Sequence, residues 1–127
     1  MFASAVLDWH ENVAWAVVVG NAAAGFWALG AHWIEALRRR ALWWFVAGVQ
    51  VLLFVQVGLG VAVVAREDIE APEFHMFYGF VALMAVGIVY SYRQQLASHR
   101  YLLYAGGSLF IAGLAIRAML IGPEATL

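Results

Sequence analysis

The stretch ALWWFVAGVQVLLFVQVGLGVAVVA, residues 41–65, decides the fold of this chain. It contains no charged residue, and a helix needs only about 20 apolar residues to cross the hydrocarbon core of a bilayer. It is too long for a strand and lacks the period-two alternation of a half-buried strand. The stretch therefore predicts a membrane-spanning helix in which Gln50 and Gln56 are the polar side chains.

Three further stretches have the length and apolar character of membrane spans. They are residues 13–37, 74–92 and 101–121. Because the connections between the spans are short, consecutive helices are expected to run antiparallel and to pack as neighbours. Residues 1–127 are therefore predicted to form one all-α domain, an integral membrane four-helix bundle with up-down-up-down order.

The charged residues predict the orientation of this bundle, because arginine and lysine gather in cytoplasmic connections. The first and third connections are basic, and the second is acidic. The arginines are Arg38, Arg39, Arg40, Arg93 and Arg100, and the acids are Glu67, Asp68, Glu70 and Glu73. We expect both termini on the outer side of a bacterial cytoplasmic (inner) membrane, with lipid around the helices.

The overall composition agrees with a membrane protein and excludes several classes of site. The chain is 65% hydrophobic and 12% charged, whereas soluble domains are near half apolar and a quarter charged. Its net charge of −1 offers no basic surface for nucleic acid. It has no cysteine, which excludes disulfides, iron–sulfur clusters, thiolate zinc sites and covalently attached haem.

Two histidines are candidate metal ligands. His10 and His75 fall at the outer ends of the first and third helices, which lie diagonally across an up-down bundle. At matched depth they can face each other, as the two axial ligands of haem b require. The alternative for each is an interfacial histidine in contact with water.

The residues that follow each histidine at helical spacing are mostly small, so a flat macrocycle fits between the two backbones. On the first helix they are Ala14, Val17, Asn21 and Gly25, and on the third they are Gly79, Ala82 and Val86. Small residues also let membrane helices pack closely without any ligand, and both interpretations stay open.

Two polar residues inside the spans extend the candidate site. Arg117 lies about one turn inside the outer end of the fourth helix, where it can hold a haem propionate or reach the lipid headgroups or a nearby acid. Gln56 is expected to face the bundle and bond to a neighbour or a ligand. No catalytic residue is identified.

The other two histidines, His32 and His99, fall at the inner ends of the first and fourth helices. These helices are adjacent, which suits a porphyrin less well, so both are interpreted as interfacial or loop residues. A copper site of His10, His75 and Met76 is a further hypothesis, since imidazole and thioether are suitable ligands.

A histidine opens one helix, QVGLG (residues 56–60) lies on the next, and a second histidine opens the third. The order of these features resembles one half of the haem A synthase family. The resemblance implies a four-helix bundle in which His10 and His75 occupy the haem-ligand positions. Leu7 stands where the family has a glutamate and Glu11 where it has an arginine, so the oxidation chemistry attributed to that glutamate is not implied.

Three functions follow as expectations. The first is a haem b-binding electron carrier or redox subunit of a respiratory membrane complex, with quinol as a possible partner. The second is a cofactor-free accessory subunit of a larger complex or homo-oligomer. The third is a haem-modifying enzyme like haem A synthase, although a stand-alone enzyme is the less favoured interpretation.

Overall fold

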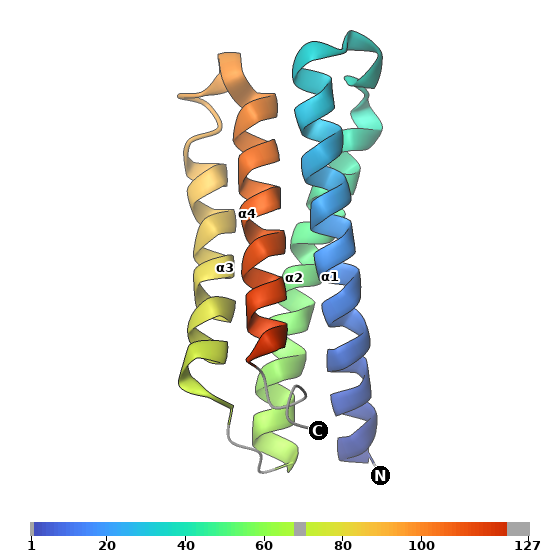
Figure 1. Cartoon of the computed structure of the whole chain (residues 1–127), viewed down its shortest axis with the longest axis vertical. Helices are drawn as coiled ribbons and strands as arrows, with labels where there is room; N and C mark the ends of the chain where they lie inside the picture. Colours follow the sequence, from blue (N-terminus) through green and yellow to red (C-terminus); the bar gives the residue numbers. More distant parts are fainter. Residues whose placement is uncertain (1, 68–70, 122–127) are drawn as a thin grey trace.

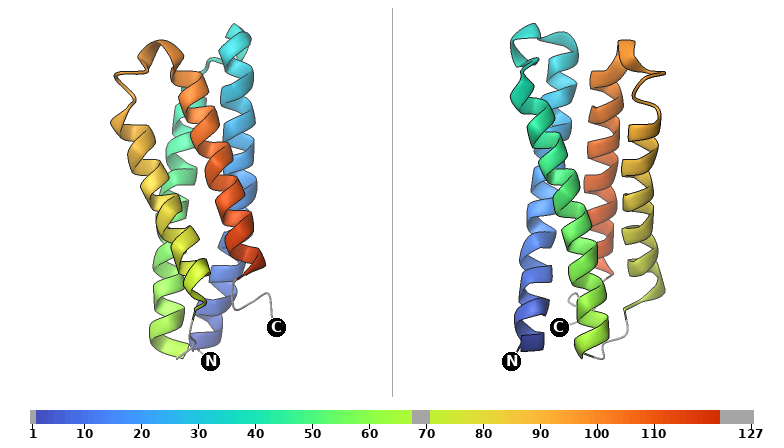
Figure 2. Two further views of the ribbon diagram at one scale, coloured as in Figure 1. Left: turned by 60° about the vertical axis from the view of Figure 1, so that its left-hand side comes forward. Right: turned by 180° about the vertical axis from the view of Figure 1, so that it is seen from behind.

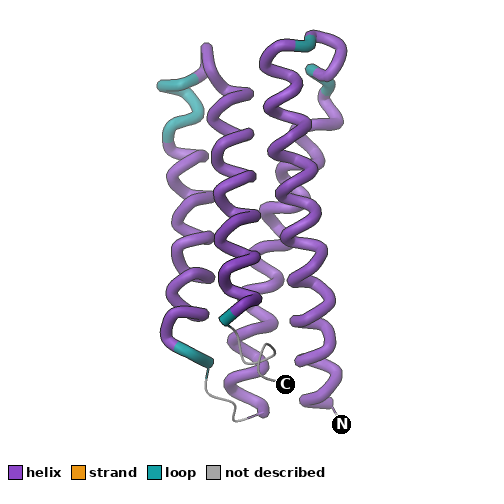
Figure 3. The backbone as a smooth tube through the Cα atoms, viewed as in Figure 1, coloured by secondary structure: helices purple, strands orange, loops and turns teal. Residues whose placement is uncertain are grey.

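The computed structural model describes residues 2–67 and 71–121, and in that part of the chain it contains helices and turns but no strand. The long helices are α1 (Phe2–Trp33), α2 (Arg40–Glu67), α3 (Glu73–Ser91) and α4 (Arg100–Leu120). Short 3-10 helices, η1 (Glu35–Leu37) and η2 (Ala97–His99), occupy the first and third connections. The predicted all-α four-helix bundle is confirmed, with connections only at its two ends (Figure 1, Figure 3).

Each long helix forms all or most of a segment that is long and apolar enough to cross a membrane. Most of each segment's surface faces outward, as in a bundle surrounded by lipid. These candidate spans are Ala5–Trp33, Arg40–Arg66, Glu73–Ser91 and Ala97–Leu120. The direction in which they cross stays a prediction, and Asp68 and Glu70 of the acidic connection lie outside the described residues.

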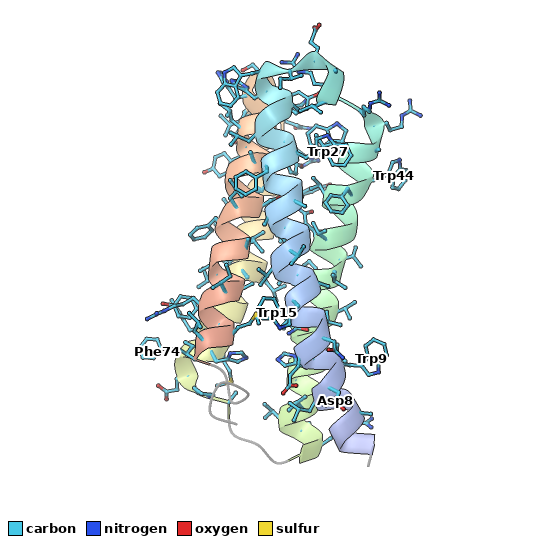
Figure 4. All side chains as sticks on the ribbon, turned by 45° about the vertical axis from the view of Figure 1, so that its right-hand side comes forward. Asp8, Trp9, Trp15, Trp27, Trp44 and Phe74 are labelled. Carbon is cyan, nitrogen blue, oxygen red and sulfur yellow. The ribbon has the colours of Figure 1, made fainter. Side chains whose placement is uncertain are left out.

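The two ends of the bundle differ in what they hold. The start of α1, the end of α2, the start of α3 and the end of α4 share one end, named here the histidine end because it carries His10 and His75 (Figure 1). The opposite end, named the arginine end, holds η1 and η2 with Arg38 and Arg100. Tryptophans lie toward both ends, with Trp9 near one and Trp27 and Trp44 near the other (Figure 4).

The helices do not pack evenly around the bundle. Helix α1 packs against both α2 and α4, and α3 packs against α4. Helices α2 and α3 touch far less, and α1 and α3 are diagonal, as expected from the connections. Seen from behind, α1 and α2 lie on one side of the bundle and α3 and α4 on the other (Figure 2). The bundle is therefore least closed between α2 and α3.

Small residues set the tight contacts. A Cβ added at Gly25 of α1 would lie 2.6 Å from Cγ of Leu109 on α4, so these two helices approach as closely as glycine permits. One core cluster lies toward the arginine end and the other toward the middle of the bundle. The first contains Ala24, Ala28, Ala31, Leu42, Val46, Val49 and Ala105, and the second contains Val17, Leu53, Ala82, Ala85, Val86 and Ile111.

The first helix is displaced relative to the predicted span, residues 13–37. It begins at Phe2, because Asp8 and Glu11 limit an apolar span but do not break a helix, and no glycine or proline precedes Gly20. It ends at Trp33, because the Arg38 guanidinium donates hydrogen bonds to carbonyl oxygens near that end, which a continuing helix would use itself. The other three helices begin and end within two residues of their predicted spans.

Candidate functional site

A cavity of about 440 Å³ lies within the bundle near the histidine end, and all four long helices contribute to its lining. This is within the range of roughly 300–1,000 Å³ that small-molecule sites occupy. The second core cluster forms its floor through Val17, Leu53 and Ala82. Its lining is nearly all apolar, and the lining residues Val61 and Phe80 are also exposed on the outer surface of the bundle. The cavity therefore opens sideways, toward the space that lipid fills around a membrane bundle.

His10 and His75 both line this cavity, and their rings meet across it. The ring centroids are 6.2 Å apart, and the ring planes are inclined by 71°. His10 is buried, with 7% of its surface exposed, and His75 is partly buried. The structure thus brings together two side chains that the sequence places on diagonal helices.

The separation of the rings matches the distance for two imidazoles on opposite sides of one metal ion. A metal–nitrogen bond of about 2.0–2.1 Å, plus about 1.1 Å from nitrogen to ring centre on each side, gives roughly 6.3 Å between centroids. Each ring can turn about its own metal–nitrogen bond, so an inclination of 71° is compatible with this arrangement. Two rings at the angle of a tetrahedral site would have their centres closer together.

The orientation of His75 is set by α4. Its Nδ1 lies 2.7 Å from the backbone oxygen of Ala118. A carbonyl oxygen can only accept, so Nδ1 carries the proton and donates it. In the neutral ring this leaves the lone pair on Nε2, which is the arrangement that metal-bound histidines use.

His10 packs against the backbone of α2. A Cβ added at Gly60 would lie 3.0 Å from Cε1 of His10, which is closer than ordinary van der Waals contact. The absence of a side chain at Gly60 therefore makes room for the imidazole. Gly58, two residues earlier, would place a Cβ in open space.

Two other candidate residues line the same cavity. A Cβ at Gly79, one turn below His75, would meet nothing within 4 Å, so this part of the cavity is bounded by bare backbone. Gln56 has a buried Oε1 with no hydrogen-bond partner among the residues that the structure describes. Such an acceptor is costly in an apolar wall unless a ligand or solvent supplies a donor.

The helix faces expected to line the site do point inward. The residues that follow His10 at helical spacing, Ala14, Val17 and Asn21, are all buried, and Asn21 is fully so. The Nδ2 of Asn21 donates a hydrogen bond to the Val17 carbonyl, 2.9 Å away. On α3, Ala82 and Val86 are buried below Gly79. Both faces therefore point into the bundle, but of these residues only Ala14, Val17, Gly79 and Ala82 line the cavity.

Arg117 does not join the histidines. Its side chain is exposed, and it is not among the residues that line the cavity. No ion pair links it to an acid within the described part of the chain. This position fits the alternative in which Arg117 reaches toward headgroups.

His32 and His99 lie at the arginine end and make separate local contacts. The His32 ring is 4.7 Å from the ring of its neighbour Trp33, in an edge-to-face arrangement. The exposed His99 places Nδ1 3.0 Å from Oγ of Ser98. Within residues 2–67 and 71–121 no group of three or more His, Asp or Glu side chains is arranged to hold a metal ion.

Two features of the site could not be predicted from the sequence. The Ala118 carbonyl is a backbone group, so no residue type indicates that it will accept a hydrogen bond from His75. The contact of Gly60 with His10 depends on how α1 and α2 cross, although QVGLG did mark this part of α2. Tyr78 also lines the cavity, and its position three residues after His75 on the same helix face could have indicated this. Met76, which the copper hypothesis names, lines the cavity as well.

Comparison of the chain with protein-family models, with curated proteins and with solved structures gives no match. The resemblance to one half of haem A synthase therefore stays a prediction that rests on His10, His75 and QVGLG alone.

Proposed function

We propose that this chain is an integral membrane haem b protein in which His10 and His75 are the two axial ligands. The observation that carries the proposal is the 6.2 Å between their ring centroids, across a cavity of about 440 Å³. It is supported by the hydrogen bond from His75 to Ala118, which leaves Nε2 available.

When bound, haem would supply a one-electron couple between ferric and ferrous iron. The chain's own residues would hold and shield it. His10 and His75 would hold the iron from its two sides. Gly60 and Gly79 would let the helix backbone lie close to the bound haem, and the apolar lining would exclude water. Filled axial positions favour electron transfer over oxygen binding, so we assign the chain an electron-transfer role.

The cavity favours haem over a single copper ion. Imidazole and thioether can bind copper, and Met76 lines the cavity beside the two histidines. A bare ion, however, requires little volume beyond its ligands, whereas this cavity extends past the histidines to Val17 and Leu83. An apolar space that continues past the two histidines suits a flat macrocycle better than a bare ion.

A haem titration tests the proposal. We expect the purified protein to bind one haem per chain, with a Soret absorbance change that saturates at that ratio. His10→Ala and His75→Ala should each weaken binding at least tenfold, because each removes one iron–imidazole bond.

Matched controls are available at the opposite end of the bundle. His32→Ala and His99→Ala remove the same side chain away from the cavity and should leave affinity and stoichiometry unchanged. Equal affinity in all four variants would reject His10 and His75 as ligands.

A further inference from the structure

Two arginines at the arginine end of the bundle each lie near the same aromatic ring. The guanidinium carbon of Arg38 lies 5.2 Å from the centre of the Tyr101 ring, and that of Arg100 lies 5.1 Å from it. Arg100 is also 5.5 Å from the centre of the Trp43 ring. All three distances are within the range of about 6 Å for cation–π attraction.

The rings form a supported platform. The centres of Trp43 and Tyr101 are 5.4 Å apart with planes inclined by 34°, and Trp43 also contacts Tyr104 edge-on at 5.1 Å. These three aromatic residues are partly buried and pack against the core cluster nearest this end. The platform therefore helps to hold the two exposed guanidinium groups in fixed positions.

Both guanidinium groups are anchored without being neutralised. Arg38 donates from Nε to the Ala31 oxygen at 2.7 Å and from Nη2 to the His32 oxygen at 2.8 Å. Arg100 donates from Nη2 to the Tyr101 hydroxyl at 3.2 Å. A guanidinium has five N–H donors, so each side chain keeps several donors for an acceptor outside the protein. Within the described part of the chain, neither forms an ion pair with a carboxylate.

The chemistry of the cluster selects a phosphate. Planar guanidinium forks match phosphate oxygens, and two such groups beside one ring supply two positive charges. Tryptophan and tyrosine at the end of a membrane bundle lie at the depth of lipid headgroups. At that depth the abundant phosphate belongs to phospholipid, and its acyl chains can lie along the apolar helices below.

We propose that Arg38 and Arg100, held on the Tyr101–Trp43 platform, bind the phosphate of an anionic phospholipid. The site is independent of the proposed haem, since it lies at the opposite end of the bundle. Anionic lipid is preferred over zwitterionic lipid because the site carries two unneutralised positive charges.

Native mass spectrometry of the whole chain in detergent, titrated with phosphatidylglycerol or phosphatidylcholine, tests this site. We expect phosphatidylglycerol to bind about tenfold more tightly than phosphatidylcholine. Both phosphates can accept from the guanidinium groups, but the choline cation of phosphatidylcholine is repelled by the two arginines. Arg100→Gln should remove most of this preference, and Arg100→Lys should restore it only in part, because the fork is lost.

Arg40→Gln is the matched control, because Arg40 is an exposed arginine at the same end that contacts no aromatic ring among the described residues. It should retain the preference for phosphatidylglycerol. Arg38→Gln also removes the hydrogen bonds at the end of α1 and can prevent folding. In that case the result for Arg100→Gln alone tests the proposal.

Three results would overturn the proposal. Equal loss in Arg40→Gln and Arg100→Gln would mean that general positive charge attracts the lipid. An unchanged preference in Arg100→Gln would remove the cluster from the interaction. Displacement of the lipid by inorganic phosphate at about equal concentration would mean that free phosphate, and not lipid, is the ligand.

Discussion

At the scale of single residues, the site depends on what is missing beside each imidazole as much as on the imidazole itself. His10 fits because Gly60 has no side chain, and the space below His75 exists because Gly79 has none. The His75 ring is then held by one backbone carbonyl on α4. Each histidine is positioned by a different neighbouring helix, so the pair depends on both the α1–α2 and the α3–α4 contacts.

A methyl group at Gly60 tests this dependence. We expect Gly60→Ala to weaken haem binding about tenfold, because its Cβ would lie 3.0 Å from His10 Cε1 and overpacking costs about 1–3 kcal/mol. Gly58→Ala meets nothing within 4 Å and should bind haem like the unchanged protein. Haem titration of the two variants checks the difference, and equal affinities would show that His10 needs no clearance at Gly60.

At the scale of helices, the uneven packing creates the cavity. Helix α3 packs mainly against α4, and α2 packs mainly against α1, so α2 and α3 are left apart near the histidine end. Its mouth is apolar, with Val61 and Phe80 exposed beside it. A redox partner that reaches the site by this route would be lipid-soluble, and a quinol has that property.

Filling the cavity from α3 should separate ligand binding from folding. Gly79→Leu would place a side chain in the open part of the cavity, so we expect haem binding to fall at least tenfold while thermal stability is unchanged or higher. Gly87→Leu, on the exposed face of the same helix, should change neither. Haem titration with thermal unfolding in detergent measures both. Full haem binding by Gly79→Leu would place the ligand elsewhere.

At the scale of the whole molecule, the two ends carry different chemistry, with a histidine pair at one and an arginine–aromatic cluster at the other. The excess of arginine at one end predicts that this end is cytoplasmic. The histidine end would then face outward, and an electron partner on the outer side would find the site near its own surface.

This orientation can be measured directly because the chain has no cysteine of its own. We expect Glu35→Cys and Gln95→Cys, at exposed positions of the arginine end, to react with a membrane-impermeant maleimide only in inside-out vesicles. Glu73→Cys, exposed at the start of α3, should react with the same reagent in spheroplasts. The reverse labelling pattern would invert the proposed topology.

The sequence predicted more of the fold than of the site. Residues 41–65 clearly predict a spanning helix, and the short connections make α1 and α3 diagonal. It could therefore be predicted that His10 and His75 face each other. The end of α1 could not be predicted, because Arg38 folds back on backbone carbonyl oxygens, which every residue has. Arg117 illustrates the remaining limit, because a helical position alone does not tell whether a long side chain faces a cavity or lipid.

The most direct measurement of the central claim is the absorption spectrum of the dithionite-reduced, haem-loaded protein before and after carbon monoxide. With His10 and His75 both on iron, the unchanged protein should show sharp α and β bands that carbon monoxide leaves in place. His75→Gly should bind carbon monoxide with a shifted Soret band, and added imidazole should restore the original spectrum. A protein that takes up no haem, or whose spectrum is the same in His75→Gly, would contradict the account.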